Sequence, residues 1–154
     1  MEMQYHKWHS PALNRDMECK VYGRSGRPML FVPCQDGRFF DFENFHMADT
    51  LAPWIDEGQL MVFSIDTIDR ETWSNTNGNP RWRIERHEQW IRYIIDEMAP
   101  FMRSLANECN GWTGYPGIMV FGCSLGALHA ANLYFRFPDV FDCLLALSGV
   151  YSAD

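Results

Sequence analysis

Four short runs of apolar residues along the chain predict strands of a sheet. The run at residues 29–32 predicts a buried strand, and the unbroken run at residues 118–121 suits a parallel strand buried on both faces. The runs occupy residues 29–32, 60–65, 118–121 and 143–148. A further short strand is predicted at residues 18–23, whereas residues 1–17 are expected to form an irregular N-terminal segment.

The segments between these runs have the spacing of helices. Residues 47–55 are expected to form a short helix, and apolar residues recur every three or four positions across residues 84–105. Pro100 is expected to kink or break that longer helix, because proline lacks a backbone donor. Residues 66–83 are rich in turn formers and predict a polar loop, and residues 125–137 predict another helix. Strands that alternate with helices indicate an α/β fold with a mainly parallel sheet flanked by helices.

The composition and charge fit one globular domain that binds a small molecule. Of the 154 residues 47% are hydrophobic, which is enough to bury a core, and the formal net charge is −7. Lys and Arg are scattered singly, without the basic stripe of a nucleic-acid binder. No stretch approaches the ~18 consecutive apolar residues of a membrane span, and residues 1–11 lack the apolar core of a secretory signal. Neither a nucleic acid nor a membrane is therefore expected as a partner.

The five cysteines argue against a disulfide framework and against a zinc site. They are odd in number, and no two of them form a C-x-x-C pair. We therefore expect a reducing compartment, the cytoplasm, and no bound metal.

The sequence GCSLG at residues 122–126 is a candidate nucleophile elbow. It follows the apolar run at residues 118–121 and precedes a predicted helix, which is the context that the motif G-x-S-x-G requires. A serine hydroxyl is a weak nucleophile, so acyl transfer needs it exposed on a sharp turn, next to donors that stabilise an oxyanion. Ser124 is accordingly the predicted nucleophile, and the alternative is an ordinary tight turn between a strand and a helix.

Two backbone amides are predicted to stabilise the oxyanion. The amide of Leu125 would lie at the start of the helix after the nucleophile, where the helix N-terminus favours negative charge. The second donor is expected from the loop after residues 29–32, which lies beside the elbow in folds with this motif, and Gln35 is the candidate. The alternative is that residues 33–38 form only a connecting turn.

The stretch at residues 122–141, GCSLGALHAANLYFRFPDVF, is followed by ALSGVYS. Together with PMLFVPCQDGRFFDFENF and FSIDTIDRETW, it resembles the putative-esterase (esterase D-like) family of α/β-hydrolases, and the resemblance runs from about Val21 onward. It implies a carboxylic-ester hydrolase with a Ser-His-Asp triad that acts on a small-molecule ester without a metal or an organic cofactor. An acyltransferase on the same fold is the second activity that this resemblance allows.

The chain departs from that family's pattern after the elbow. In α/β-hydrolases the triad acid and histidine lie on loops after later strands. Only His129 follows the nucleophile, and it lies in the same helix, too near in sequence to act as the general base. Asp139, Asp142 and Asp154 fall too early to match the family's acid. Residues 1–154 are therefore expected to form a single, C-terminally truncated α/β-hydrolase domain whose triad Asp and His are missing.

A non-catalytic role is the alternative from another class of function. A truncated hydrolase fold could persist as a fragment or as an interaction module. The strand predicted at residues 143–148 would then be an apolar edge of the sheet. Such an edge predicts pairing with a missing C-terminal segment or with a second copy in a homo-oligomer.

Several loop side chains are candidates for contact with the substrate, because loops at the carboxyl ends of parallel strands form the site in such sheets. They are Asp36, His46, Arg70 and Trp73, with Asp66 and Asp69 in the same loop as the last two. Each has a structural alternative as a residue of a surface loop or of a packed, capped loop. His87 lies on the apolar side of the long predicted helix and is expected to be a core histidine.

Overall fold

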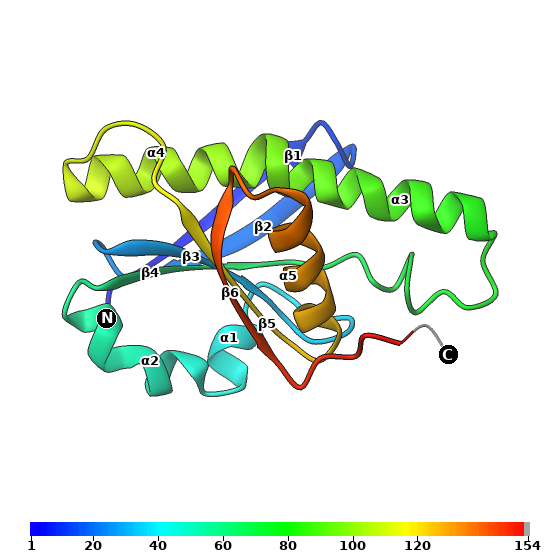
Figure 1. Ribbon diagram of the computed structural model, residues 1–154, viewed down its shortest axis with the longest axis horizontal. Coiled ribbons are helices and arrows are strands. Elements are labelled where there is room, and N and C mark those ends of the chain that lie inside the picture. The colour runs from blue at the N-terminus through cyan, green and yellow to red at the C-terminus, as the bar shows by residue number, and fades with distance from the viewer. Residues whose placement is uncertain (153–154) are drawn as a thin grey trace.

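The computed structural model describes residues 1–152, which form one six-stranded sheet with helices on both faces (Figure 1). The strands are Met3–Ser10 (β1), Arg15–Tyr22 (β2), Arg27–Val32 (β3), Leu60–Ile65 (β4), Ile118–Cys123 (β5) and Phe141–Leu147 (β6). They lie in the order β1-β2-β4-β3-β5-β6. The last four of that order are parallel, whereas β1 and β2 add an antiparallel hairpin at one edge. The expected α/β fold with a mainly parallel sheet is confirmed.

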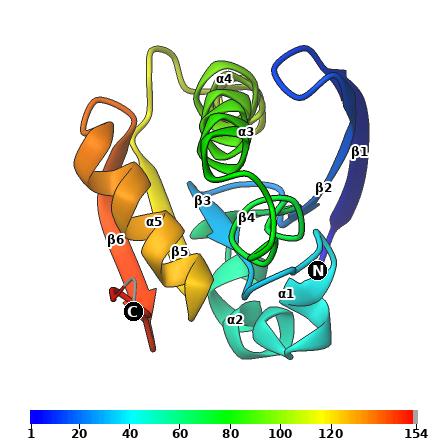
Figure 2. The same cartoon turned by 90° about the vertical axis from the view of Figure 1, so that its right-hand side faces the viewer.

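The helices are divided between the two faces of the sheet (Figure 2). They are α1 (Asp41–Asn44), α2 (Met47–Asp56), α3 (Pro80–Arg92), the π-helical segment η1 (Tyr93–Met98), α4 (Ala99–Asn110) and α5 (Leu125–Arg136). The continuous rod formed by α3, η1 and α4 covers one face together with α5, and α1 and α2 cover the other. Among residues 1–152, no helix is both long and apolar enough to cross a bilayer.

The central strand β3 contributes to two separate cores. Leu30 and Val32 pack in the larger buried cluster, beneath the rod and α5. Met29 and Phe31 point to the opposite face and pack in the smaller cluster, where Phe42 of α1 covers them. Because both faces of the strand are buried, its sequence is continuously apolar rather than alternating.

The N-terminal segment differs from the expectation that residues 1–17 are irregular. They form β1 and the start of β2, paired from Met3 opposite Tyr22 to Ser10 opposite Arg15. The inward positions of β1 alternate with exposed ones, but two of the partly buried positions carry Gln4 and His6. Polar residues at inward positions hid the alternation that would have predicted a strand.

The long helix begins earlier than expected, and Pro100 does not end it. Asn79 caps the first turn by accepting from the Trp82 amide at 3.0 Å, and Pro80 occupies the first helical position, where it needs no donor. Residues 80–83 are therefore helical rather than part of the loop. Pro100 lies in the first turn of α4, directly after the π-helical segment, and this wider turn lets the rod continue past the residue that lacks an N–H.

Candidate active site

Ser124 occupies the turn between β5 and α5, at the carboxyl edge of the parallel strands. Its backbone has φ +56° and ψ −123°, in a region that favours glycine and is costly for a residue with a side chain. Two hydrogen bonds of 3.0 Å hold it there: its N–H donates to the Leu147 carbonyl, and its own carbonyl accepts from the Ala127 amide. Ser124 therefore lies in a strained turn that the surrounding chain fixes from both β6 and α5.

The two glycines of the motif allow this turn to pack closely. A Cβ on Gly122 would collide with the backbone of Gly126 and Ala127 in the first turn of α5. A Cβ on Gly126 would collide with the carbonyl oxygens of Val32 and Pro33 at the end of β3. These atoms belong to the backbone and cannot be displaced cheaply, so both positions require glycine for steric reasons.

The loop after β3 lies against the Ser124 turn. The two strands β3 and β5 are parallel neighbours, with Val32 paired to Gly122, so both end at the same edge. Leu125 is the first residue of α5 and is 7% exposed. Gln35 lies in the loop, where its side chain donates to the Ser74 hydroxyl at 2.7 Å. The structure thus places the segments of both predicted oxyanion donors at one edge of the sheet.

The loops after β3 and β4 are joined by hydrogen bonds. Thr67 donates to the Gly37 carbonyl from its amide at 3.3 Å and from its hydroxyl at 3.0 Å. The Asp66 carboxylate accepts from the Arg38 side chain at 2.8 Å and from the Phe39 amide at 2.9 Å. Burial raises the pKa of Asp66 although Arg38 opposes the rise. The two loops therefore form one connected rim.

Asp69 connects this rim to α5. Its carboxylate accepts from His129 Nε2 at 2.9 Å through Oδ1 and from the Asp36 amide at 3.1 Å through Oδ2. Both side chains of the Asp69–His129 pair are almost fully buried, at 3% and 1% exposure. Asp36 has φ +60°, and its own carboxylate accepts from the Ser74 hydroxyl at 2.7 Å.

His129 is enclosed by rings from the loop and the rod. Its ring centroid lies 4.9 Å from Trp90, 5.4 Å from His87 in a stacked arrangement, and 5.9 Å from Trp73. Burial, and secondly the charge of His129, lower the pKa of His87 to about 4. His87 is 6% exposed, so the prediction of a core histidine is confirmed.

The four side chains predicted to contact substrate do not gather in one place. Asp36 and Arg70 line a polar cavity of about 680 Å³ beside the joined loops. Trp73 lines a separate apolar pocket of about 190 Å³, together with His87. His46 lies apart from them at the start of α2, with its side chain 83% exposed and 3.3 Å from Asp49.

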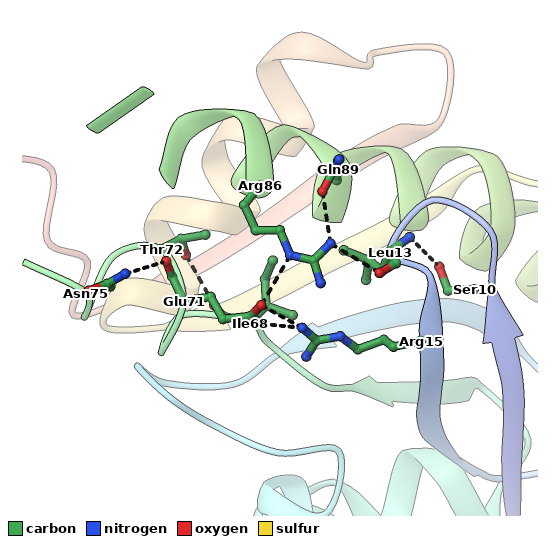
Figure 3. A network of polar contacts seen from close by, with 9 residues as sticks. All are labelled: Ser10, Leu13, Arg15, Ile68, Glu71, Thr72, Asn75, Arg86 and Gln89. Atoms are coloured by element: carbon green, nitrogen blue, oxygen red, sulfur yellow. Dashed lines mark hydrogen bonds and ion pairs between the residues drawn. The ribbon is translucent and has the colours of Figure 1, made fainter. Parts of the chain in front are cut away.

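An ion-pair network fixes the loop after β4 to the N-terminal hairpin (Figure 3). Glu71 accepts from Arg15 at 2.6 Å and from Arg86 at 3.2 Å. Arg86 also donates to the Leu13 carbonyl at 3.2 Å and to Gln89 at 2.9 Å. Because Arg15 and Glu71 border the polar cavity, the hairpin that the sequence did not reveal supplies one wall of it.

Within the part of the chain that the structure describes, no histidine ring is hydrogen-bonded to the Ser124 hydroxyl. Asp142 pairs with Arg27 at the start of β3, which is the edge of the sheet opposite to Ser124. Asp154 lies outside the described residues. Over residues 1–152, no three His, Cys, Asp or Glu side chains are grouped so that they could hold a metal ion.

Comparison with known proteins places this arrangement in a family. The model of the putative-esterase family matches residues 10–153. Among solved structures, the chain is similar to an IroE-like serine hydrolase from Shewanella oneidensis, with a TM-score of 0.65 and 20% identity over 96% of this chain and 51% of that one. It is also similar to a ferulic acid esterase, with a TM-score of 0.70 and 17% identity over 99% of this chain and 62% of that one.

A third similar structure is the enterobactin esterase from Shigella flexneri, with a TM-score of 0.64 and 18% identity over 98% of this chain and 37% of that one. The chain thus spans between 37% and 62% of the length of these three structures. Their likeness shows the fold of the α/β serine hydrolases. Among curated proteins, no sequence match is found.

Proposed function

Since the chain belongs to the putative-esterase family, we propose that it is the nucleophile-bearing part of a serine esterase that cleaves carboxylic esters through an acyl-enzyme on Ser124. The backbone of Ser124 carries this proposal, because it is held at a positive φ of +56° at the end of β5. A strained turn at the carboxyl edge of a parallel sheet presents a serine hydroxyl above that edge, as a nucleophile elbow does.

The chemistry that we propose has two steps. In the first, Ser124 Oγ bonds to the carbonyl carbon of the ester, and its proton passes through a base to the departing alcohol. In the second, water attacks the acyl-serine, which releases the carboxylic acid and restores the hydroxyl. The amides of Leu125 and Gln35 would stabilise the negative charge on the carbonyl oxygen in both steps. Asp36 and Arg70 line one polar cavity at these loops and remain the candidates for contact with the substrate.

We infer that the triad acid and histidine come from outside residues 1–152. His129 supports this inference, because its Nε2 donates to Asp69 and its ring is 1% exposed. The partial coverage of the similar structures, 51% and 62% of their length, is in keeping with it. A small-molecule ester is the substrate class that follows from the family.

A non-catalytic interaction module is the second candidate, favoured by the edge of the sheet. The edge strand β6 exposes Leu145 and Leu147, at 43% and 42%, and Phe135 of the neighbouring α5 is 75% exposed. Apolar edges of this kind pair with further strands or with other chains. A further segment of the same protein or a second copy in a homo-oligomer would cover these residues.

The cytoplasm is the compartment that we propose. All five cysteines are free thiols. Burial raises the pKa of Cys19 to about 12, so that this thiol stays protonated and unreactive. Free thiols are typical of a reducing environment.

Hydrolysis of p-nitrophenyl acetate in the presence of added imidazole tests the proposal. Imidazole can replace a base that the chain lacks, so we expect turnover that rises with imidazole concentration and depends on Ser124. Ser124→Ala serves as the control and gives the background hydrolysis that imidazole catalyses by itself, which is subtracted. Trapping of an acetyl group on Ser124, seen by peptide mass spectrometry, would identify the intermediate. Equal rates for both proteins at every imidazole concentration would instead favour the interaction module.

A further inference from the structure

The oxyanion donors of the proposed function come from two separate segments, and something must fix the distance between them. The Leu125 amide belongs to α5, whereas the Gln35 amide belongs to the loop after β3. The contact of Gly126 with the carbonyls of Val32 and Pro33 fixes the start of the loop but not the turn beyond it. Oxyanion donors act only within about 2.7–3.1 Å of the developing charge, so a small shift of that turn would weaken catalysis.

We propose that Asp69 is a positioning residue that sets this distance by binding α5 and the loop after β3 with one carboxylate. This inference rests on the proposed function. Its two oxygens are divided between the segments: Oδ1 accepts from His129 of α5 at 2.9 Å, and Oδ2 accepts from the Asp36 amide at 3.1 Å. We call this arrangement the Asp69 bridge. It reaches the peptide that directly follows Gln35.

The Asp69 bridge is rigid on both sides. The backbone carbonyl of Asp69 accepts from the amides of Thr72 at 3.0 Å and Ser74 at 2.8 Å, which folds the loop tightly around it. The Ser74 hydroxyl contacts the side chains of both Gln35 and Asp36. It accepts from the Gln35 amide group and donates to the Asp36 carboxylate, each at 2.7 Å. Residues 35 and 36 are therefore held by three hydrogen bonds from one short segment.

The other end of the bridge cannot move independently of α5. The His129 ring is 1% exposed and is confined by Trp73, Trp90 and His87 at centroid distances of 4.9–5.9 Å. A buried carboxylate that already accepts two hydrogen bonds offers no donor to an oxyanion, so Asp69 acts through the segments that it holds. This role also explains why a histidine lies one turn beyond the nucleophile without serving as its base.

Substitution of Asp69 separates this role from a general effect on stability. In Asp69→Ala we expect the Ser124-dependent, imidazole-supported kcat for p-nitrophenyl acetate to fall by about tenfold or more, with little change in KM. Asp69→Asn keeps an oxygen for the Asp36 amide and should recover most of the turnover. Glu97→Ala is the matched control, because Glu97 also joins two segments, bonding Trp8 at 3.0 Å and Ser10 at 2.8 Å in the edge strand β1, which three strands separate from β5. It should leave kcat unchanged.

Hydrogen exchange measured by mass spectrometry provides a readout that does not depend on activity. Asp69→Ala should speed exchange in peptides that contain Asp36 and the first turn of α5, whereas Glu97→Ala should not. Unchanged exchange at Asp36 would show that the bridge does not hold the loop, and faster exchange with an unchanged kcat would show that the bridge is only structural. Absence of Ser124-dependent turnover in the unsubstituted chain would overturn the proposed function, and with it the role of Asp69 in catalysis. In that case the hydrogen-exchange measurement still decides whether the Asp69 bridge holds the loop.

A milder variant covers the case in which Asp69→Ala does not fold. Ser74→Ala removes only the hydroxyl that contacts Gln35 and Asp36, and the residue is half-buried. We expect a fall in kcat of about twofold to fivefold, with faster exchange at Asp36 and unchanged exchange in β4. A folded Ser74→Ala protein with the turnover and exchange of the unsubstituted chain would overturn the proposal.

Discussion

Replacement of His87 should remove a defined part of the pH dependence of stability. The side chain is 6% exposed, stacks on His129 at 5.4 Å and meets the Trp90 ring at 6.0 Å. Burial, followed by the charge of His129, lowers its pKa from 6.5 to about 4. His87 is therefore neutral in the native state over a range in which the unfolded chain binds a proton.

The sign and size of the effect follow from this difference. Between the unfolded pKa of 6.5 and the native pKa of about 4, the unfolded state holds more protons, so the free energy of unfolding falls as the pH falls. Each pH unit contributes about 1.4 kcal/mol, so the full interval is worth about 3 kcal/mol. Above pH 6.5 the contribution of His87 is constant, and below about pH 4 it changes no further.

Urea unfolding followed by the fluorescence of the six tryptophans measures this effect. The unsubstituted chain is compared with His87→Gln and His87→Phe at several values between about pH 7.5 and pH 4. Gln and Phe fill the site differently, so the free energy of unfolding of each variant will be offset from that of the unsubstituted chain by a different constant amount. Both should nevertheless lose the same slope, because neither residue titrates. Curves that stay parallel to that of the unsubstituted chain over the whole range would refute the reasoning.

Two further substitutions test how the start of α5 and the start of α3 contribute to stability. In a urea titration, Gly126→Ala should lower the free energy of unfolding by about 3 kcal/mol or more, because the added Cβ meets backbone carbonyls. Gly111→Ala is the control and should cost about 1 kcal/mol. Its added Cβ meets nothing within 4 Å, and only the φ of +67° is unfavourable. Equal losses would contradict the steric argument. Asn79→Ala should lower the free energy of unfolding by about 1 kcal/mol, because it removes the cap of α3, and Asn79→Ser should restore most of that loss. A melting temperature that Asn79→Ala leaves unchanged would show that the cap contributes nothing.

Much of the fold could be predicted because its central strands are buried on both faces. The run at residues 60–65 coincides with β4, and the other three runs lie within or overlap β3, β5 and β6. The hairpin could not be predicted in the same way, because β1 lies at an edge and carries His6 at a partly buried position, against the ring of Phe101. A polar aromatic residue that packs by its ring has no apolar signature in the sequence.

The candidate site likewise contains one part that neighbouring residues in the sequence predict and another part that depends on residues far apart in the sequence. The motif around Ser124 is contiguous, so strand, turn and helix could be inferred from neighbouring residues. The Asp69–His129 pair joins residues that are 60 positions apart. Their meeting depends on the order of the strands, in which β3 separates β4 from β5, and the apolar pattern does not contain that order. The sequence therefore predicts that His129 is not the base, but it does not reveal that Asp69 is its partner.

The strain at Ser124 shows which part of the proposed catalysis this chain can hold by itself. A serine in this strained, positive-φ conformation persists only where its surroundings over-determine its backbone. Here β6 holds the Ser124 amide through Leu147, β3 meets the next turn at Gly126, and Asp69 holds α5 from the loop after β4. Two parallel strands and the loop after a third thus fix the Ser124 turn, and none of these contacts involves a base. In the proposed reaction, positioning of the serine and transfer of its proton are therefore separable, and the contacts named here concern only the first of them.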